Sequence, residues 1–168
     1  LDRSAENRER AFKCLLESIS QKWPDYQEHL ERCEKLGERF AHAIGLKKQE
    51  VQDLKMLIRL HGIGLALVPP DTFHKTGPLT EKEWEALKRH PEAGFRITRV
   101  FPETARISGE ILAVRERWDG RGYPKGIDGK CIPLLSRIVA IIEAYDRMTH
   151  KRFEQAALSH AQAVEELE

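Results

Sequence analysis

Apolar side chains recur at the spacing of an α-helix in most segments of this chain, and this pattern restricts its fold more than any other feature. Shorter helices are expected to start at Thr80, where Glu83 completes a capping box, at Pro91, and at Ser159. The longer stripes predict helices over residues 3–20, 24–44, 48–60, 103–117 and 134–148. The last of these is the most apolar and should be a central buried helix. The sequence therefore predicts an all-α bundle.

Two segments lack this periodicity and should be irregular. Residues 68–79 hold three prolines and a glycine, and they predict a connection without regular structure. Residues 119–133 hold four glycines and two prolines. We expect this second segment to form a long structured loop, with room for a small hairpin, and to carry the function of the bundle.

Length and composition set the broad class. A chain of 168 residues, 40% of them apolar and 33% charged, fits one domain over residues 1–168: an N-terminal helix (1–23), a core (24–149) and a helical tail (150–168). A net charge of +1 argues against binding to nucleic acid or to an anionic membrane. The start at Leu1, within a helical pattern, suggests a domain excised from a longer protein.

The cysteines and the hydropathy pattern predict a bacterial cytoplasmic protein. Cys14, Cys33 and Cys131 are odd in number and widely spaced, which argues against disulfides and zinc–cysteine sites. Cys14 and Cys33 fall in apolar helical stripes, where buried thiols are expected. No stretch is long and apolar enough to span a membrane, and no signal peptide is visible.

Three stretches resemble one known family. They are His61-Gly62-Ile63-Gly64, the segment TEKEWEALKRHP at 80–91, and the block WDGRGYPKGIDGKCIPLLSRI at 118–138. Together they are similar to the HD-GYP family, a branch of the HD-domain phosphohydrolases, over roughly residues 26–149. The resemblance implies an HD-domain helical bundle with a Gly/Pro-rich loop, and active members of that family hydrolyse the bacterial messenger cyclic di-GMP.

The resemblance also implies seven metal-ligand positions, which this chain fills incompletely. His29 (in a His-x-x-Arg pattern with Arg32), His61 and His90 match, and Glu143 stands where an Asp is expected. Gly62 replaces the Asp that should bridge two metals. Val114 and Arg115 stand where the family has two consecutive His residues, and Leu65 replaces a Lys near the substrate phosphate.

These replacements remove the donor atoms that two metals need. Hydrolysis in this family depends on a water activated between metal ions. His29, His61 and Glu143 could still hold one zinc, iron or manganese ion, whereas His90 alone is no second site. Arg115 could occupy the vacancy and pair with Glu143, or bind a phosphate. We therefore expect no catalytic residues and no cofactor, with at most one divalent metal on the vestigial ligands.

Several of these residues also have a purely structural interpretation. His61 could simply cap helix carbonyls, and His90 before Pro91 could mark a helix boundary. Within the loop, Trp118 and Tyr123 could merely fix it to the bundle, with Asp119 capping its turn. The resemblance instead links the loop to partner recognition, including GGDEF-type diguanylate cyclase domains. The candidate partner or ligand residues are Arg115, Trp118, Asp119, Gly120, Arg121, Gly122, Tyr123, Pro124, Lys125 and Arg137.

Three functional hypotheses follow from the resemblance. The first is a catalytically silent regulatory or protein-interaction domain in bacterial cyclic di-GMP signalling. The second is an effector that binds a cyclic dinucleotide without cleaving it, through Arg115, Arg121, Lys125 and Arg137. The third is a phosphoesterase with one metal on His29, His61 and Glu143. A homodimer through the first helix is also conceivable.

Overall fold

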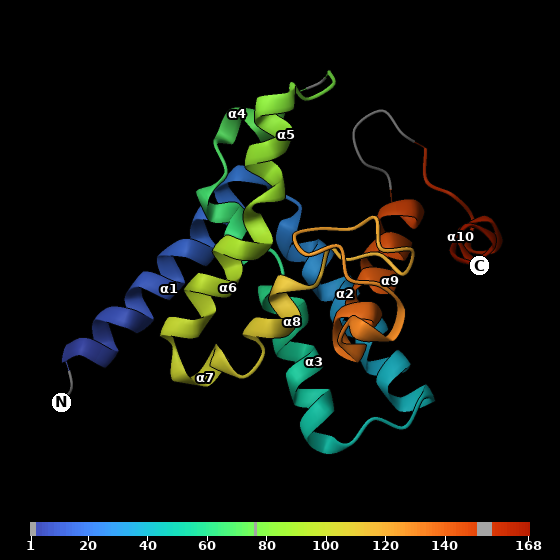
Figure 1. The fold of residues 1–168 in the computed structure, drawn as a ribbon, viewed down its shortest axis with the longest axis horizontal. Helices are drawn as coiled ribbons and strands as arrows, with labels where there is room; N and C mark the ends of the chain where they lie inside the picture. The colour runs from blue at the N-terminus through green and yellow to red at the C-terminus, as the bar shows by residue number, and fades with distance from the viewer. Residues whose placement is uncertain (1–2, 76, 151–155) are drawn as a thin grey trace.

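The computed structural model describes residues 3–75, 77–150 and 156–168, and these residues form helices and loops without a β-strand. The fold is therefore all-α, as the periodicity predicts (Figure 1). The elements are α1 (Arg3–Lys22), α2 (Tyr26–Ala43), α3 (Lys48–Leu60), the 3₁₀ turn η1 (Ile63–Leu67), α4 (Pro70–His74), α5 (Glu81–Lys88), α6 (His90–Val100), α7 (Pro102–Ala105), α8 (Ser108–Leu112), the 3₁₀ turn η2 (Gly129–Cys131), α9 (Leu134–Thr149) and α10 (His160–Leu167).

The core lies between α2, α3, α8 and α9, where buried aliphatic side chains from all four helices meet. Leu57 of α3, Ile111 of α8 and Ile138 of α9 are almost completely buried. Removing their apolar surface from water is the main contribution to stability. The central position predicted for the apolar helix is confirmed, because α9 contacts α2, α3 and α8.

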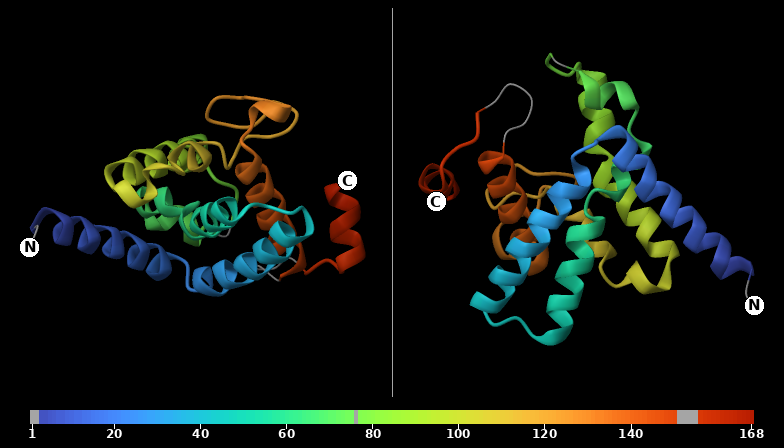
Figure 2. Two further views of the ribbon diagram at one scale, coloured as in Figure 1. Left: turned by 90° about the horizontal axis from the view of Figure 1, so that it is seen from below. Right: turned by 180° about the vertical axis from the view of Figure 1, so that it is seen from behind.

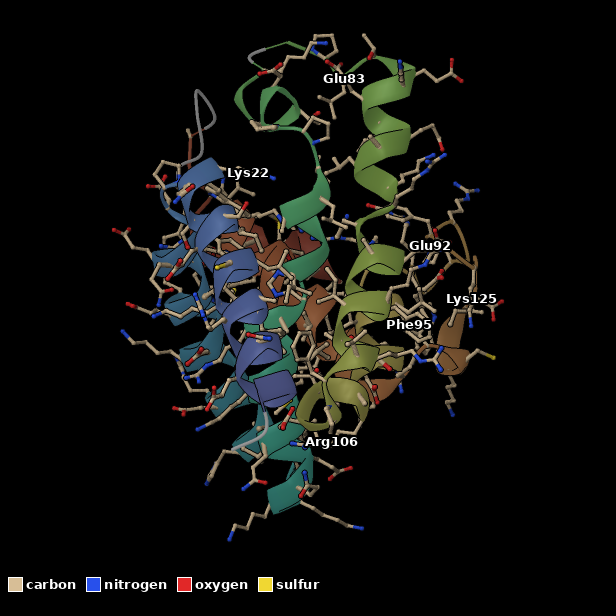
Figure 3. The ribbon with its side chains drawn as sticks, turned by 90° about the vertical axis from the view of Figure 1, so that its left-hand side faces the viewer. Lys22, Glu83, Glu92, Phe95, Arg106 and Lys125 are labelled. Atoms are coloured by element: carbon tan, nitrogen blue, oxygen red, sulfur yellow. The ribbon has the colours of Figure 1, made fainter. Side chains whose placement is uncertain are left out.

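Helix α6 packs closely against η1, and this contact places the end of α3 beside the start of α6. The close approach depends on Gly64, since a Cβ atom there would overlap the backbone of His90. Across the same turn, Lys22 at the end of α1 donates a hydrogen bond from Nζ to the Val68 carbonyl at 2.9 Å (Figure 3). These contacts fix the position of the His61–Gly64 turn.

Helix α10 lies beside α9, far from the N-terminus of α1 (Figure 2). Its N-cap is Ser159, which forms a capping box with Gln162. Ala163 is fully buried, and the hydroxyl of Tyr145 lies 2.8 Å from Nδ1 of His160. None of the described helices has both the length and the apolar composition needed to cross a membrane.

The structure corrects four details of the predicted layout. Residues 103–117 form two short helices, α7 and α8, and not one, because Ile107 leaves the helical conformation with φ −103° and ψ 5°. The connection at 68–79 contains the short helix α4, which begins at Pro70. Cys14 is exposed and not buried, whereas Cys33 is buried as expected. No hairpin forms between Asp119 and Pro133, where the described backbone contains η2 as its helical turn.

Candidate functional site

The carboxylate of Glu143 is the centre of a buried polar cluster. Its side chain is 3% exposed, and Arg115 holds both oxygens, with Nη1–Oε2 at 2.6 Å and Nη2–Oε1 at 3.1 Å. His61 Nε2 lies 3.0 Å from Oε1, and Arg147 Nη2 donates to the same oxygen at 3.1 Å. Burial alone would raise the pKa of Glu143, but Arg115 and His61 outweigh it and hold this pKa well below its usual value. Glu143 is therefore a carboxylate surrounded by cationic groups.

Three histidines around this centre each direct Nδ1 toward a protein oxygen. His61 Nδ1 lies 2.6 Å from the Ile58 carbonyl oxygen, and His90 Nδ1 lies 2.8 Å from that of Leu87. His29 Nδ1 lies 2.7 Å from Oδ2 of Asp146. Because these oxygens accept hydrogen bonds, each Nδ1 donates, which leaves Nε2 as the other functional atom. This arrangement is typical of metal-ligating histidines.

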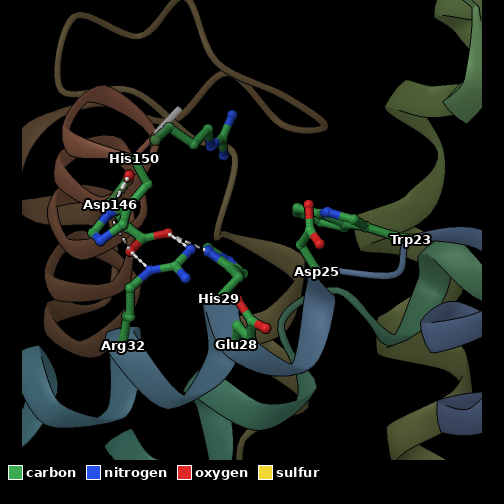
Figure 4. A pocket seen from close by; sticks show the side chains of 8 residues that line it. Trp23, Asp25, Glu28, His29, Arg32, Asp146 and His150 are labelled. Carbon is green, nitrogen blue, oxygen red and sulfur yellow. Dashed lines mark hydrogen bonds and ion pairs between the residues drawn. The ribbon is translucent and has the colours of Figure 1, made fainter. Parts of the chain in front are cut away.

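Asp146 organises the His29 side of the cluster (Figure 4). Beyond its contact with His29, it accepts hydrogen bonds from Arg32 Nε at 2.6 Å and Nη2 at 3.0 Å, and His150 Nδ1 lies 3.1 Å away. Burial would raise the pKa of Asp146, but His29 and Arg32 lower it to about 2. A pocket of about 210 Å³ opens beside this group, and Trp23, Asp25 and Glu28 complete its wall.

Arg115 joins Glu143 to His90. Besides its two bonds to Glu143, its Nε donates to His90 Nε2 at 3.4 Å. Burial and the neighbouring Arg115 charge lower the pKa of His90 to about 4, so His90 is neutral and its Nε2 is a hydrogen-bond acceptor. A guanidinium thus lies against both an imidazole lone pair and a carboxylate. Of the two alternatives for Arg115, pairing with Glu143 or binding a phosphate, the structure shows the pairing with Glu143.

The space beside Gly62 is taken by Tyr26. A Cβ atom at residue 62 would lie 2.5 Å from the Tyr26 hydroxyl oxygen, closer than van der Waals contact allows. Tyr26 begins α2 and is 1% exposed, so its ring has little freedom to move away. An aspartate side chain at residue 62 would therefore need Tyr26 to shift.

The residues present fit one metal ion better than two. Donor atoms of His29, His61 and Glu143 lie within 4.8 Å of one another, and two imidazoles with a carboxylate suit zinc or iron(II). The same is true of His29, Cys33 and Asp146, although Arg32 and His29 already bind both oxygens of Asp146. Near His90 the Arg115 guanidinium lies against the imidazole Nε2, and Val114 is a buried core residue.

A cleft of about 550 Å³ leads to Glu143, within the usual size range of ligand sites. Its wall carries the basic residues Lys22, Lys75, Arg115 and Arg147, together with aromatic side chains. Trp84 and Tyr123 meet edge to face, with ring centroids 6.5 Å apart. The cleft thus combines positive charge with planar apolar surfaces, which suits an anionic ligand that carries a ring.

The loop residues singled out from the sequence divide between two surfaces. Tyr123 and Arg115 line the cleft at Glu143, whereas Trp118, Asp119 and Arg137 line a separate groove on α9. Arg121 and Lys125 are exposed, and Figure 3 shows Lys125 at the outside of the loop. Asp119 caps its turn by accepting the Arg121 N–H at 3.0 Å. The remaining loop residues, Gly120, Gly122 and Pro124, are partly exposed. The four basic residues proposed as phosphate contacts therefore do not converge.

Asp146 and Tyr26 are among the site residues that were not identified from the sequence. Asp146 orients His29, and Tyr26 fills the space at Gly62. For Asp146 a signal was present, because it lies three residues after Glu143 and so on the same face of α9. Tyr26 gave no comparable signal, since its contact joins the start of α2 to the end of α3.

Comparison with known proteins places this arrangement in a family. The family model described as HD domain matches residues 13–168. The 3'3'-cGAMP-specific phosphodiesterase 2 of Vibrio cholerae is 35% identical over 141 residues, which are 83% of this chain and 27% of that protein. The cyclic di-GMP phosphodiesterase response regulator RpfG of Xanthomonas campestris is 36% identical over 125 residues, 73% of this chain and 33% of that protein. The chain thus spans about a third or less of these relatives.

A solved structure shares the fold. It is a cyclic GMP-AMP specific phosphodiesterase of V. cholerae, which superimposes with a TM-score of 0.65 at 19% identity and covers 91% of this chain and 42% of that one. The family match extends over nearly the whole sequence. The HD-type resemblance inferred from the His61 turn and the 118–138 block is therefore confirmed, and this chain belongs to the HD domain family.

Proposed function

We propose that this chain is a regulatory or protein-interaction domain of bacterial cyclic-dinucleotide signalling that does not hydrolyse the messenger. The observation that carries the proposal is the position of Arg115. Its guanidinium lies against His90, the remaining ligand position of a second metal ion, and holds both oxygens of Glu143. Gly62 offers no bridging carboxylate, and Tyr26 occupies the neighbouring space. Without two cations, no water is held and activated between them.

A hydrolysis assay tests this proposal. Purified protein is incubated with cyclic di-GMP, and separately with 3'3'-cGAMP, in the presence of manganese, iron(II) or zinc, and products are resolved by chromatography. We expect no turnover above a His61→Ala variant. Metal-dependent turnover that His61→Ala abolishes would overturn the proposal.

Binding of a cyclic dinucleotide without cleavage is the second candidate function, and the cleft at Glu143 favours it. Arg115, Arg147 and Lys75 supply positive charge, and Trp84 and Tyr123 supply aromatic faces for a base. Calorimetry with intact cyclic di-GMP tests it. Saturable heat that is lost in Arg147→Met supports the effector role, and no heat at high micromolar ligand ends it.

The third candidate, a single metal on His29, His61 and Glu143, is supported by the orientation of the two histidines. Such an ion would supply Lewis-acid chemistry at the bottom of the cleft. The opposing observation is that Arg115 and Arg147 already balance the charge of Glu143, which His61 also contacts. A GGDEF-type partner and a cytoplasmic location remain parts of this proposal.

A further inference from the structure

The small pocket beside Asp146 and the cleft at Glu143 are neighbouring compartments, because three residues belong to the wall of both. These residues are Trp23, Asp25 and Arg147. We call the smaller compartment, which encloses about 210 Å³, the Asp146 pocket. It lies below the usual size range of sites for drug-sized ligands, so it suits a single ring system, whereas the cleft encloses about 550 Å³. A ligand of two parts can therefore extend from one compartment into the other.

Positive charge predominates in the cleft. Its wall carries four cationic side chains and two carboxylates, which are Lys22, Lys75, Arg115, Arg147, Asp25 and Glu143. Arg115 and Arg147 both contact Glu143, so one of their two charges is not neutralised by it. Lys22 donates to backbone carbonyls, which leaves its charge in the cleft as well. The cleft therefore suits an anionic group such as a phosphate.

The Asp146 pocket is acidic by comparison. Its two guanidiniums, of Arg32 and Arg147, already contact buried carboxylates, and its two histidines lie against Asp146. The exposed carboxylates of Asp25 and Glu28 also line this pocket. A compartment that favours hydrogen-bond donors thus adjoins one that favours an anion.

Asp25 stands on the shared wall next to an aromatic surface. Figure 4 shows Trp23 and Asp25 on the side of the pocket opposite Asp146. Asp25 is the N-cap residue of α2, but its side chain makes no cap hydrogen bond and is exposed. The Trp23 indole stacks on His29, with ring centroids 5.3 Å apart and planes 22° apart. This contact holds the indole as a flat wall, on which a planar ring can stack.

A planar ring with hydrogen-bond donors on its edge complements an aromatic wall beside a carboxylate. Among the nucleobases, guanine presents two adjacent donors, N1–H and the 2-amino group, which match the two oxygens of one carboxylate. Adenine presents a donor next to an acceptor on the corresponding edge, and that acceptor would face a carboxylate oxygen. The wall formed by Trp23 and Asp25 therefore favours guanine over adenine.

We propose that the Asp146 pocket binds the guanine base of a nucleotide whose phosphate lies in the cleft, and that Asp25 selects this base by accepting hydrogen bonds from N1–H and the 2-amino group. This assignment rests on the second candidate function, binding of a cyclic dinucleotide, and adds the base and the residue that recognises it. Glu28 lines the pocket alone, whereas Asp25 also lines the cleft and so stands between the two parts of the ligand.

Calorimetry with cyclic di-GMP, 3'3'-cGAMP and cyclic di-AMP tests the base preference. The first two ligands carry a guanine, and we expect each to bind about tenfold or more tightly than cyclic di-AMP, because only guanine makes both hydrogen bonds to the carboxylate. Asp25→Asn should weaken both guanine ligands about tenfold, since its amide sets an NH2 group against a guanine donor, and should not weaken cyclic di-AMP. Asparagine is as good an N-cap residue as aspartate, so the start of α2 is preserved.

The sign of the effect separates recognition from charge. Removing a carboxylate near the cleft makes its field more positive, which by itself would tighten the binding of every anionic ligand. Glu31→Gln is the matched control, because it removes an exposed carboxylate of α2 that lies outside both compartments. We expect it to weaken none of the three ligands. Thermal unfolding of both variants shows that they are folded.

Equal affinity for the three ligands, or tighter binding of all three by Asp25→Asn, would overturn the assignment and leave cyclic-dinucleotide binding in place. If no cyclic dinucleotide binds, the second candidate function fails, and GMP and AMP at millimolar concentration then probe the pocket directly by ligand-observed NMR. GMP binding that Asp25→Asn abolishes supports the assignment, and the absence of such binding overturns it. Turnover measured on the same samples reports on the proposed lack of hydrolysis independently.

Discussion

The Arg115–Glu143 pair should contribute strongly to stability when no metal is present. Arg115→Met keeps a flexible apolar side chain but removes the guanidinium that binds both oxygens of Glu143. Breaking a buried ion pair by deleting one partner costs about 3–5 kcal/mol, because the remaining charge is left uncompensated. His61 and Arg147 still contact Glu143 after the substitution. We therefore expect a loss at or just below the lower end of that range, about 2–3 kcal/mol in the free energy of unfolding.

The assay is urea unfolding at pH 7 in the presence of a chelator, with Arg117→Met as the matched control. Arg117 is 65% exposed and pairs with Asp119 at 2.8 Å, and an exposed pair of this kind is worth at most about 1 kcal/mol. Both variants lose one arginine and gain one methionine, so only the burial of the pair differs. If Arg115→Met is no more destabilising than Arg117→Met, the Glu143 carboxylate does not depend on this guanidinium and the reasoning fails.

Three more predictions follow from the same cluster. Gly62→Ala should destabilise the fold by about 1–3 kcal/mol, because its Cβ atom would overlap the Tyr26 hydroxyl. Tyr26→Phe should reduce that loss in a double-mutant cycle measured by urea unfolding. Equal losses with Tyr26 and with Phe at residue 26 would contradict the contact. The pKa of His90 is lowered from 6.5 to about 4, so the unfolded chain binds a proton at a higher pH than the folded chain does, and the free energy of unfolding should fall as the pH drops from about 6.5 to 4. His90→Asn should flatten this pH dependence in chelator-treated protein. An unchanged pH dependence would refute the shift. Zinc at a fixed excess should raise the unfolding midpoint of Arg115→Met more than that of the wild type, and an equal rise would show that Arg115 does not compete with a metal.

Local sequence patterns predicted much of the helical layout. The capping box of Thr80 and Glu83 marks the start of α5, because the Thr80 hydroxyl accepts the Glu83 N–H, and the apolar run after Pro133 becomes the buried helix α9. Between α7 and α8 the apolar periodicity continues through Ile107, but the helical backbone conformation is interrupted there. Apolar spacing indicates which residues face the core and does not indicate whether the helix is continuous. Cys14 shows the converse, an apolar-type residue in a stripe that remains exposed.

The candidate site was predictable from the sequence where its residues occupy ligand positions of the family that the chain resembles. The resemblance grouped His29, His61, His90 and Glu143 as ligand positions, and with Arg115 at another of these positions it offered pairing with Glu143 as one of two alternatives. The contact of Arg115 with His90 and that of Tyr26 with Gly62 join segments far apart in the sequence. No spacing rule indicates such contacts, because they depend on how the helices pack. The division of the loop residues between the cleft at Glu143 and the separate groove on α9 has the same origin.

The number of metal ions bound per chain tests the central claim most directly, because the account has Arg115 in the place of the second cation. Protein incubated with excess manganese, iron(II) or zinc and then desalted is analysed by native and elemental mass spectrometry. The account predicts no more than one equivalent, held on His29, His61 and Glu143 if held at all. Two equivalents per chain, both lost in His61→Ala, would contradict it.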